Sequence, residues 1–323
     1  MKRIIPAYIL ILIFTSAFTG CKMDLYTWPA IENLSDMRTN TISIEQEQQG
    51  FQYRVPVTID NSAYAESFSD FPVLVKLEGS KDVLDNLVPD PGFHDVRFYT
   101  KDLEQRLSFE VEKWDPAGGE CLIWVKVPSI QAGTNPAVEF YMYYDYEGSD
   151  PLPDYPTDVW TDGFLGVWHI NESSGSTYED SSPHGSDGIG GSSYGFNDPT
   201  PTATGQIGGA QELPADPSHP VNPDFTSSAL VVDNLNPSND LRPVTFSFWL
   251  NDANFVEDGR IFYKDHGTEA AIDIFSTQNA GIKLRTEIHY DGINNQFAES
   301  TSFSGTAGNW AWHAVSWDGT EAN

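Results

Sequence analysis

Apolar and polar residues alternate with a period of two through much of residues 50–150. This period predicts half-buried β-strands, because successive side chains of a strand point to opposite faces. Strands are expected at residues 53–59, 71–77, 95–100, 107–113, 121–127 and 138–144. Pro56 cannot donate a ladder hydrogen bond, so the first strand should lie at a sheet edge or contain a bulge. Turn sequences such as residues 115–119 separate the runs, and this spacing predicts a β-sandwich at residues 50–150.

The remaining pattern divides into a linker and a second domain. Residues 151–162 are rich in proline, which stiffens a linker towards an extended form. Residues 163–170 predict a strand that places Phe164, Gly166, Trp168 and Ile170 on one face. Residues 192–243 have little strand pattern, so we expect long loops there, where ligands often bind.

Composition supports an all-β chain and limits the partners. Aromatic residues make up 13% of the chain, with 26 glycines and 21 prolines, which suits strands joined by many turns. There are 17 Lys and Arg residues against 47 Asp and Glu residues, a formal net charge of −30. Since phosphate backbones are bound by Lys and Arg, this balance argues against a nucleic-acid partner.

Residues 1–21 have the pattern of a targeting segment. Lys2 and Arg3 precede an apolar run that is too short for a confident transmembrane helix. The run ends in Phe-Thr-Gly-Cys, which resembles a bacterial lipobox and implies lipidation of Cys21. We therefore expect a lipoprotein that reaches the membrane through a lipid anchor, in the outer membrane or at the cell surface, with residues 22–49 as a flexible tether. Cys121 then has no partner and is expected to be a buried small apolar residue.

The second domain resembles a known family of jelly rolls. Its opening strand and Asp-Ser-Ser loop, residues 205–213, residues 245–250 and residues 310–319 occur in the order found in laminin-G-like, concanavalin-A-like domains of bacterial surface proteins. The resemblance implies a jelly roll over residues 163–323 and a binding module more often than an enzyme. In that family further strands follow the Trp-Asp-Gly turn, so we expect this chain to be an incomplete domain or a fragment.

The first domain resembles an uncharacterised bacterial family, the domain of unknown function twenty-three forty-one. The segments that carry the resemblance are residues 53–61, 70–75, 94–98, 109–114, 123–128 and 140–144. This family implies no activity, and its members often stand beside laminin-G-like domains. The expected fold class is therefore all-β, with two β-sandwich domains.

One pair of acids has a spacing suited to catalysis. Glu110 and Glu112 lie two apart on an expected strand, so they should share a face about 7 Å apart. Paired carboxylates at such a distance serve glycoside hydrolysis. The alternative, which we favour, is a solvated strand face, and no catalytic residues are assigned. The histidines and cysteines lack the paired spacing of a zinc site.

An acidic loop offers oxygen ligands for calcium. Glu172, Asp180 and Asp187 follow the first expected strand of the second domain. Calcium takes six to eight oxygen ligands from flexible loops, and laminin-G-like domains commonly bind it. The alternative is turn chemistry, in which Asp180 accepts local backbone N–H bonds.

Binding without catalysis is the expected function. The ligand would be carbohydrate or another extracellular ligand, stacked on tryptophans; the candidates are Trp160, Trp249, Trp310, Trp312 and Trp317. An adhesion or scaffold protein that binds an envelope protein is the alternative, and an accessory to polysaccharide-degrading enzymes is a further one. The sequence does not name the ligand or the membrane face.

Overall fold

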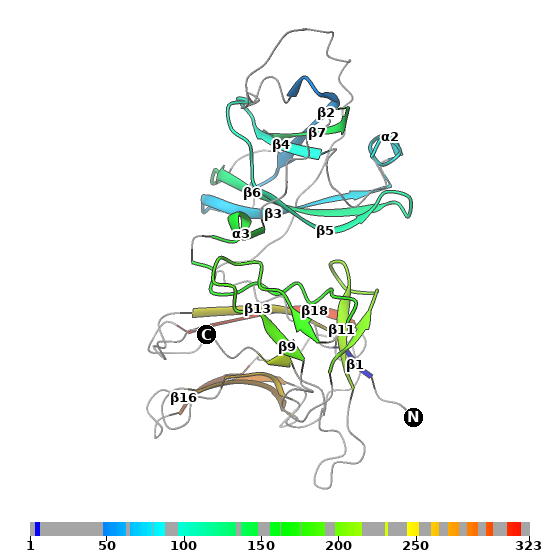
Figure 1. The fold of residues 1–323 in the computed structure, drawn as a ribbon. Helices are drawn as coiled ribbons and strands as arrows, with labels where there is room; N and C mark the ends of the chain where they lie inside the picture. The colour runs from blue at the N-terminus through cyan, green and yellow to red at the C-terminus, as the bar shows by residue number, and fades with distance from the viewer. Residues whose placement is uncertain are drawn as a thin grey trace. The chain divides into compact units, whose positions relative to one another are not determined.

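The structure is a computed structural model. It describes residues 4–6, 48–62, 65–79, 81–87, 96–133, 137–147, 156–161, 163–174, 176–190, 198–214, 230–231, 244–251, 260–264, 271–277, 283–289, 295–299 and 309–317. The chain divides into two compact units (Figure 1). Unit 1 comprises Met1–Ser16 and Gly163–Asn323, and unit 2 comprises Ala17–Asp162.

Unit 2 contains two three-stranded antiparallel sheets. In the first, β7 (Ala137–Tyr146) lies between β2 (Phe51–Ile59) and β4 (Val96–Thr100). In the second, β6 (Glu120–Ile130) lies between β3 (Phe68–Glu78) and β5 (Phe109–Asp115). Two four-residue helices, α2 (Lys81–Leu84) and α3 (Pro156–Val159), accompany them. The strands expected from the alternation are confirmed, and Pro56 lies in an edge strand with a register shift between Val57 and Thr58.

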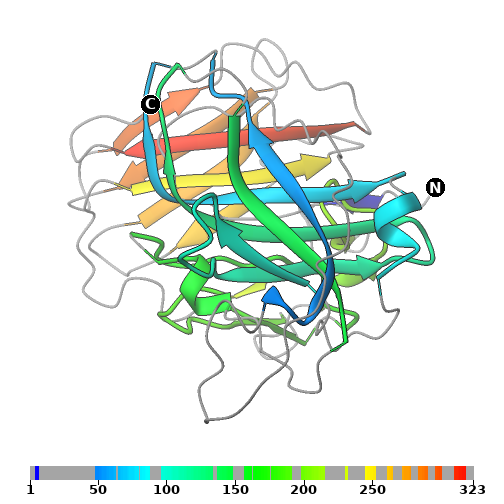
Figure 2. The same cartoon turned by 90° about the horizontal axis from the view of Figure 1, so that it is seen from above.

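The two sheets of unit 2 face each other across an apolar core. Strands β2 and β7 cross the strands of the other sheet, as in orthogonal packing (Figure 2). Phe98 of β4 and Phe109 of β5 meet with ring centroids 5.3 Å apart. Strand β6 buries Ile123 and Val125 completely on the core side. Cys121 is a buried free cysteine on the same side, which confirms its expected role as a small core residue.

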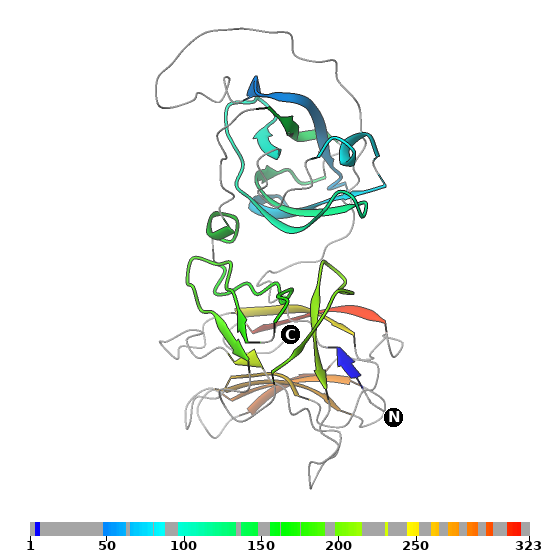
Figure 3. The same cartoon turned by 45° about the vertical axis from the view of Figure 1, so that its right-hand side comes forward.

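Unit 1 is also built of antiparallel strands. In one three-stranded sheet, β11 (Ala210–Pro214) pairs with β1 (Ile4–Pro6) and β10 (Thr200–Thr202). In another, β9 (Gly188–Gly190) pairs with β8 (Thr177–Tyr178) and β12 (Leu230–Val231). Strand β13 (Val244–Asn251) pairs with β18 (Trp310–Trp317). A four-stranded sheet holds, in order, β14 (Arg260–Lys264), β15 (Ala271–Thr277), β16 (Lys283–His289) and β17 (Asn295–Glu299). It forms a second layer below the β13–β18 pair (Figures 1 and 3).

The all-β prediction is confirmed for the described part of the chain, where helix is limited to single turns. Within that part, no helix is long and apolar enough to cross a membrane. Cys21 and residues 22–47 of the expected tether lie outside the described residues.

Strand β13 has one apolar face. Phe246, Phe248 and Leu250 are buried and alternate with polar residues and Trp249. His313 of the paired strand lies against Phe248, with ring centroids 5.5 Å apart. Burial lowers the pKa of His313 to about 4, so the imidazole is neutral near pH 7. This histidine is therefore a core-facing residue.

The expected strand at residues 163–170 is wrong. The segment is irregular, and its only described pairing is an isolated bridge between Trp168 and Asp180. Gly163 and Ile170 have φ values of 101° and 56°, which an extended strand does not allow. Phe164, Trp168 and Ile170 are buried as expected, but Val167, expected on the opposite face, is completely buried as well. Gly166 is required because a Cβ there would stand 2.1 Å from the Trp168 ring.

The expected linker at residues 151–162 also differs from the extended form. Its described part, residues 156–161, begins with helix α3 and packs against β5 and β6 of unit 2. Val159 and Trp160 are completely buried. Apolar side chains in a proline-rich stretch thus override the preference of proline for an extended chain.

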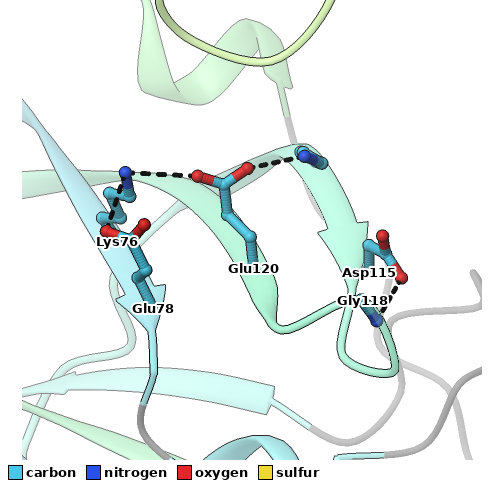
Figure 4. A network of polar contacts seen from close by, with 6 residues as sticks. Lys76, Glu78, Asp115, Gly118 and Glu120 are labelled. Atoms are coloured by element: carbon cyan, nitrogen blue, oxygen red, sulfur yellow. Dashed lines mark hydrogen bonds and ion pairs between the residues drawn. The ribbon is translucent and has the colours of Figure 1, made fainter. Parts of the chain in front are cut away.

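Charged side chains form a ladder across the second sheet of unit 2 (Figure 4). Lys76 Nζ lies 3.0 Å from Glu78 Oε2 and 3.2 Å from Glu120 Oε1, and Lys113 Nζ lies 2.5 Å from Glu120 Oε2. The hydrogen bond from Lys113 lowers the pKa of Glu120, and the hydrogen bond to Glu78 raises the pKa of Lys76. The nearby β5–β6 turn is closed by Asp115, which accepts a bond from the Gly118 N–H at 2.8 Å.

The ladder predicts acid-dependent stability. The pKa of Glu120 is lower in the folded chain than its ordinary value of 4.5. The ionised carboxylate therefore stabilises the fold fully above pH 4.5, and this stabilisation is lost as the pH falls through the lowered pKa. Glu120→Gln should therefore lower the melting midpoint of unit 2 at pH 7. The matching loss in the free energy of unfolding should be no more than about 1 kcal/mol, because solvent screens the ion pair. At pH 3 or in high salt the difference should shrink, whereas Glu104→Gln, in an exposed turn, should show no such trend. An equal difference at pH 3 and pH 7 would contradict this ladder.

Candidate functional site

The outer face of the second sheet of unit 2 carries the two glutamates whose spacing suits catalysis. We define this face as the side of β3–β6–β5 turned away from the core; it includes Glu110, Trp124 and Lys126. Glu110 lies directly opposite Trp124 where β5 pairs with β6, so both side chains lie on this face. A register shift between Val111 and Lys113 makes Glu112 an extra residue of β5. The Glu112 carboxylate accepts a 3.1 Å hydrogen bond from Trp124 Nε1.

A tryptophan from the expected linker covers this face. Trp160 is completely buried, and its Nε1 donates a short hydrogen bond to Glu110 Oε2. Its ring meets Trp124 edge-on, with centroids 5.1 Å apart and an interplanar angle of 64°. Lys126 Nζ donates to Thr161 Oγ1 in the next residue of the same segment. The two glutamates are thus each bonded to an indole N–H.

This geometry corrects the expectation of a solvated strand face. Glu110 is only 9% exposed, because Trp160 covers it. A glycosidase needs two carboxylates that converge on an open sugar site. Here Glu110 is buried and bonded to the Trp160 indole N–H, and Glu112 is bonded to the Trp124 indole N–H.

Asp180 holds the acidic loop of unit 1 in place. Its Oδ1 accepts bonds from the N–H groups of Val167 and Ser182 at 2.8 and 2.9 Å. Its Oδ2 accepts from Ser182 Oγ at 2.9 Å and from the Ser186 N–H at 2.8 Å. Asp187 Oδ1 in turn accepts from the Asp180 N–H at 2.9 Å. Asp180 therefore has the local bonds of the turn-chemistry alternative.

Glu172 stands apart from these two aspartates. Its Oε1 accepts a 3.0 Å bond from the Glu179 N–H, while its Oε2 is buried with no hydrogen-bond partner among the described residues. Burial raises the pKa of its carboxyl, against smaller opposing effects from that hydrogen bond and from His169. Across the parts of the chain that the structure describes, no group of three or more His, Cys, Asp or Glu side chains is placed to hold a metal ion.

Two further buried oxygens near Glu172 were not anticipated from the sequence. Gln211 Nε2 donates to the Glu172 carbonyl at 2.7 Å, which leaves Gln211 Oε1 without a described partner. The Tyr178 hydroxyl is likewise buried and unbonded within the described segments, and the charge of Glu172 helps burial to raise its pKa. Buried polar atoms are nearly always bonded, and an ordered water molecule is the common partner of such oxygens. No residue spacing in the sequence brings positions 172, 178 and 211 together.

Three of the candidate tryptophans share one face of the β13–β18 pair. Trp249 is directly opposite Trp312, and Asn251 is directly opposite Trp310. Side chains two apart in a strand lie on one face, so we call Trp249, Trp310 and Trp312 the tryptophan face. Trp312 is 38% exposed, and the other two are half-buried.

The edge of the tryptophan face carries a polar group. Asn251 Oδ1 is buried and has no hydrogen-bond partner within the described ranges. Of the remaining candidates, Trp160 is buried in unit 2, and the side chain of Trp317 lies outside the described residues. The alternation of residues 245–251 could have shown from the sequence that Trp249 and Asn251 share a face.

Comparison with known proteins identifies one domain. Residues 92–152 match the family described as "Domain of unknown function (DUF2341)", so the chain contains a DUF2341 domain there. The match spans β4, β5, β6 and β7, which include the central strand of both sheets of unit 2. The segments at residues 53–61 and 70–75, which were expected to belong to this family, lie before the matched range. No curated protein and no solved structure matched the chain in these comparisons.

The calcium prediction can be tested most sharply at Glu172. If calcium binds the folded chain, its addition should raise the melting midpoint, and a chelator should reverse the shift. At a hundredfold excess of calcium over Kd, the free energy of unfolding should rise by about 2.7 kcal/mol. Glu172→Gln keeps an acceptor for the Glu179 N–H but loses the charge, so it should abolish the shift. Glu179→Gln, an exposed change in the same loop, should preserve it.

Asp180 is a poorer probe, because Asp180→Asn disturbs the bonds that hold the loop and should destabilise unit 1 with or without calcium. Identical melting curves with calcium and with chelator would show that calcium does not bind the folded chain. A full shift in Glu172→Gln would remove Glu172 from the site.

Proposed function

We propose that the chain is a non-catalytic cell-surface lipoprotein that binds carbohydrate or another extracellular ligand. The observation that carries this proposal is the tryptophan face, where Trp312 is exposed beside Trp249 and Trp310. Tryptophan rings offer rigid apolar area for the faces of sugar rings.

The fold of unit 1 is consistent with this role. We propose that residues 163–323 form a laminin-G-like jelly roll, supported by the antiparallel β13–β18 pair and the opposing four-stranded sheet. A flat sheet face suits an extended polysaccharide chain better than a small, enclosed ligand. The net charge of −30 disfavours polyanions and therefore favours neutral polysaccharides.

Trp312→Ala should weaken polysaccharide binding. Loss of one stacking ring costs about 0.5–1.5 kcal/mol beyond the buried area, so the affinity should fall roughly tenfold. Binding would be measured by isothermal titration of the protein lacking residues 1–21 against a panel of neutral polysaccharides, with and without calcium. Tyr53→Ala, which removes an exposed aromatic ring of unit 2, is the matched control and should bind normally.

Two results would count against the carbohydrate proposal. Absence of binding to every polysaccharide in both conditions would remove carbohydrate as the ligand. A stoichiometric envelope protein captured by the wild type and lost in Trp312→Ala would instead support the adhesion alternative. Hydrolysis of a polysaccharide that disappears in Glu112→Gln would revive the enzyme alternative.

The lipid anchor gives a separate prediction. An acyl chain on Cys21 would hold the mature protein on an envelope membrane through burial of CH₂ groups at about 0.8 kcal/mol each. Cys21→Ala should therefore release soluble protein or leave the precursor unprocessed, as judged by fractionation and mass spectrometry. A Cys21→Ala protein that is processed normally and remains in the membrane would show that another feature anchors the chain.

A further inference from the structure

The segment that leaves unit 2 is held at three points on the outer face. Trp160 is completely buried and donates to the Glu110 carboxylate. Its ring packs edge-on against Trp124, 5.1 Å away. Thr161 accepts a hydrogen bond from Lys126. A charged acceptor, an aromatic contact and a cationic donor thus act on two consecutive residues.

The outer face is built to receive this segment. The hydrogen bond from Trp124 Nε1 to Glu112 fixes the orientation of the indole against which Trp160 packs. The register shift after Val111 places Glu112 within reach of that indole, two positions beyond Glu110. The two carboxylates therefore have different tasks, since Glu112 orients Trp124 and Glu110 binds Trp160.

The position of the segment gives this contact a consequence. The match to the DUF2341 family ends at residue 152, and unit 1 resumes at Gly163. Gly163 has a φ of 101°, a left-handed conformation that only glycine adopts without strain. The chain is thus anchored at Thr161 and can turn sharply two residues later.

We propose that Trp160 and Thr161 form an exit latch that fixes the point at which the chain leaves unit 2. With the latch closed, the hinge between the units is confined to the neighbourhood of Gly163. With the latch open, residues 156–161 leave the outer face and join the linker. An extended chain spans at most about 3.3–3.6 Å per residue, so these six residues add at most roughly 20 Å of reach.

Hydrogen exchange in the full chain tests the latch itself. In the wild type, amides of residues 157–161 should exchange slowly, because they open only when Trp160 leaves its site. Trp160→Ala should accelerate them by tenfold or more, while the core amides of β6 stay protected. Glu110→Gln retains an acceptor but loses the charge, so it should give a smaller acceleration. Glu104→Gln, the same loss of charge in an exposed turn of unit 2, is the control and should leave the exchange of these amides unchanged.

Small-angle X-ray scattering on the same proteins tests the consequence for the hinge. Trp160→Ala should broaden the distribution of overall dimensions relative to the wild type, and Glu104→Gln should not. Thr161→Ala removes the contact with Lys126 and keeps the test valid if Trp160→Ala fails to fold; it should show a partial acceleration of exchange. Unchanged exchange and scattering in both variants would overturn the proposal. Equal loss of protection in β6 would also overturn it, because Trp160 would then be an ordinary core residue of unit 2.

Discussion

The fold of unit 2 depends on strand β6, because the side chains on both of its faces make essential contacts. Strand β6 places Cys121, Ile123 and Val125 in the core between the sheets, and it is the central strand that β3 and β5 both pair with. On its other face, Trp124 and Lys126 receive the segment that leaves the unit. A shift of one residue in its register would exchange the two faces, so the core and the exit segment are specified together.

The alternation of unit 2 could be predicted because a period of two is a local property of the sequence. The expected strands there are found, and Pro56 lies at an edge. The same reasoning failed at residues 163–170, where the left-handed Gly163 and Ile170 break the extended chain and Val167 is buried together with the expected face. It also failed at Glu110, because the cover supplied by Trp160 comes from fifty positions along the chain.

The candidate sites likewise combine contacts between sequence neighbours, which could be predicted, with contacts between distant residues, which could not. Asp180 bonds to near neighbours, as its Asp-Ser-Ser sequence indicates. The contact between Gln211 Nε2 and the Glu172 carbonyl forms only through the fold. The carboxylate pair on β5 has the spacing of a hydrolytic site, yet both members are bonded to indoles, so spacing alone does not identify chemistry.

If the tryptophan face binds a neutral polysaccharide without cleaving it, binding should leave a footprint on β13 and β18. A hydrogen-exchange comparison of the protein with and without a soluble polysaccharide, together with analysis of the polysaccharide for new chain ends, would reveal it. Added protection is expected at residues 245–251 and 310–316, with no new ends. Protection centred on β5 and β6, accompanied by cleavage, would contradict the proposal.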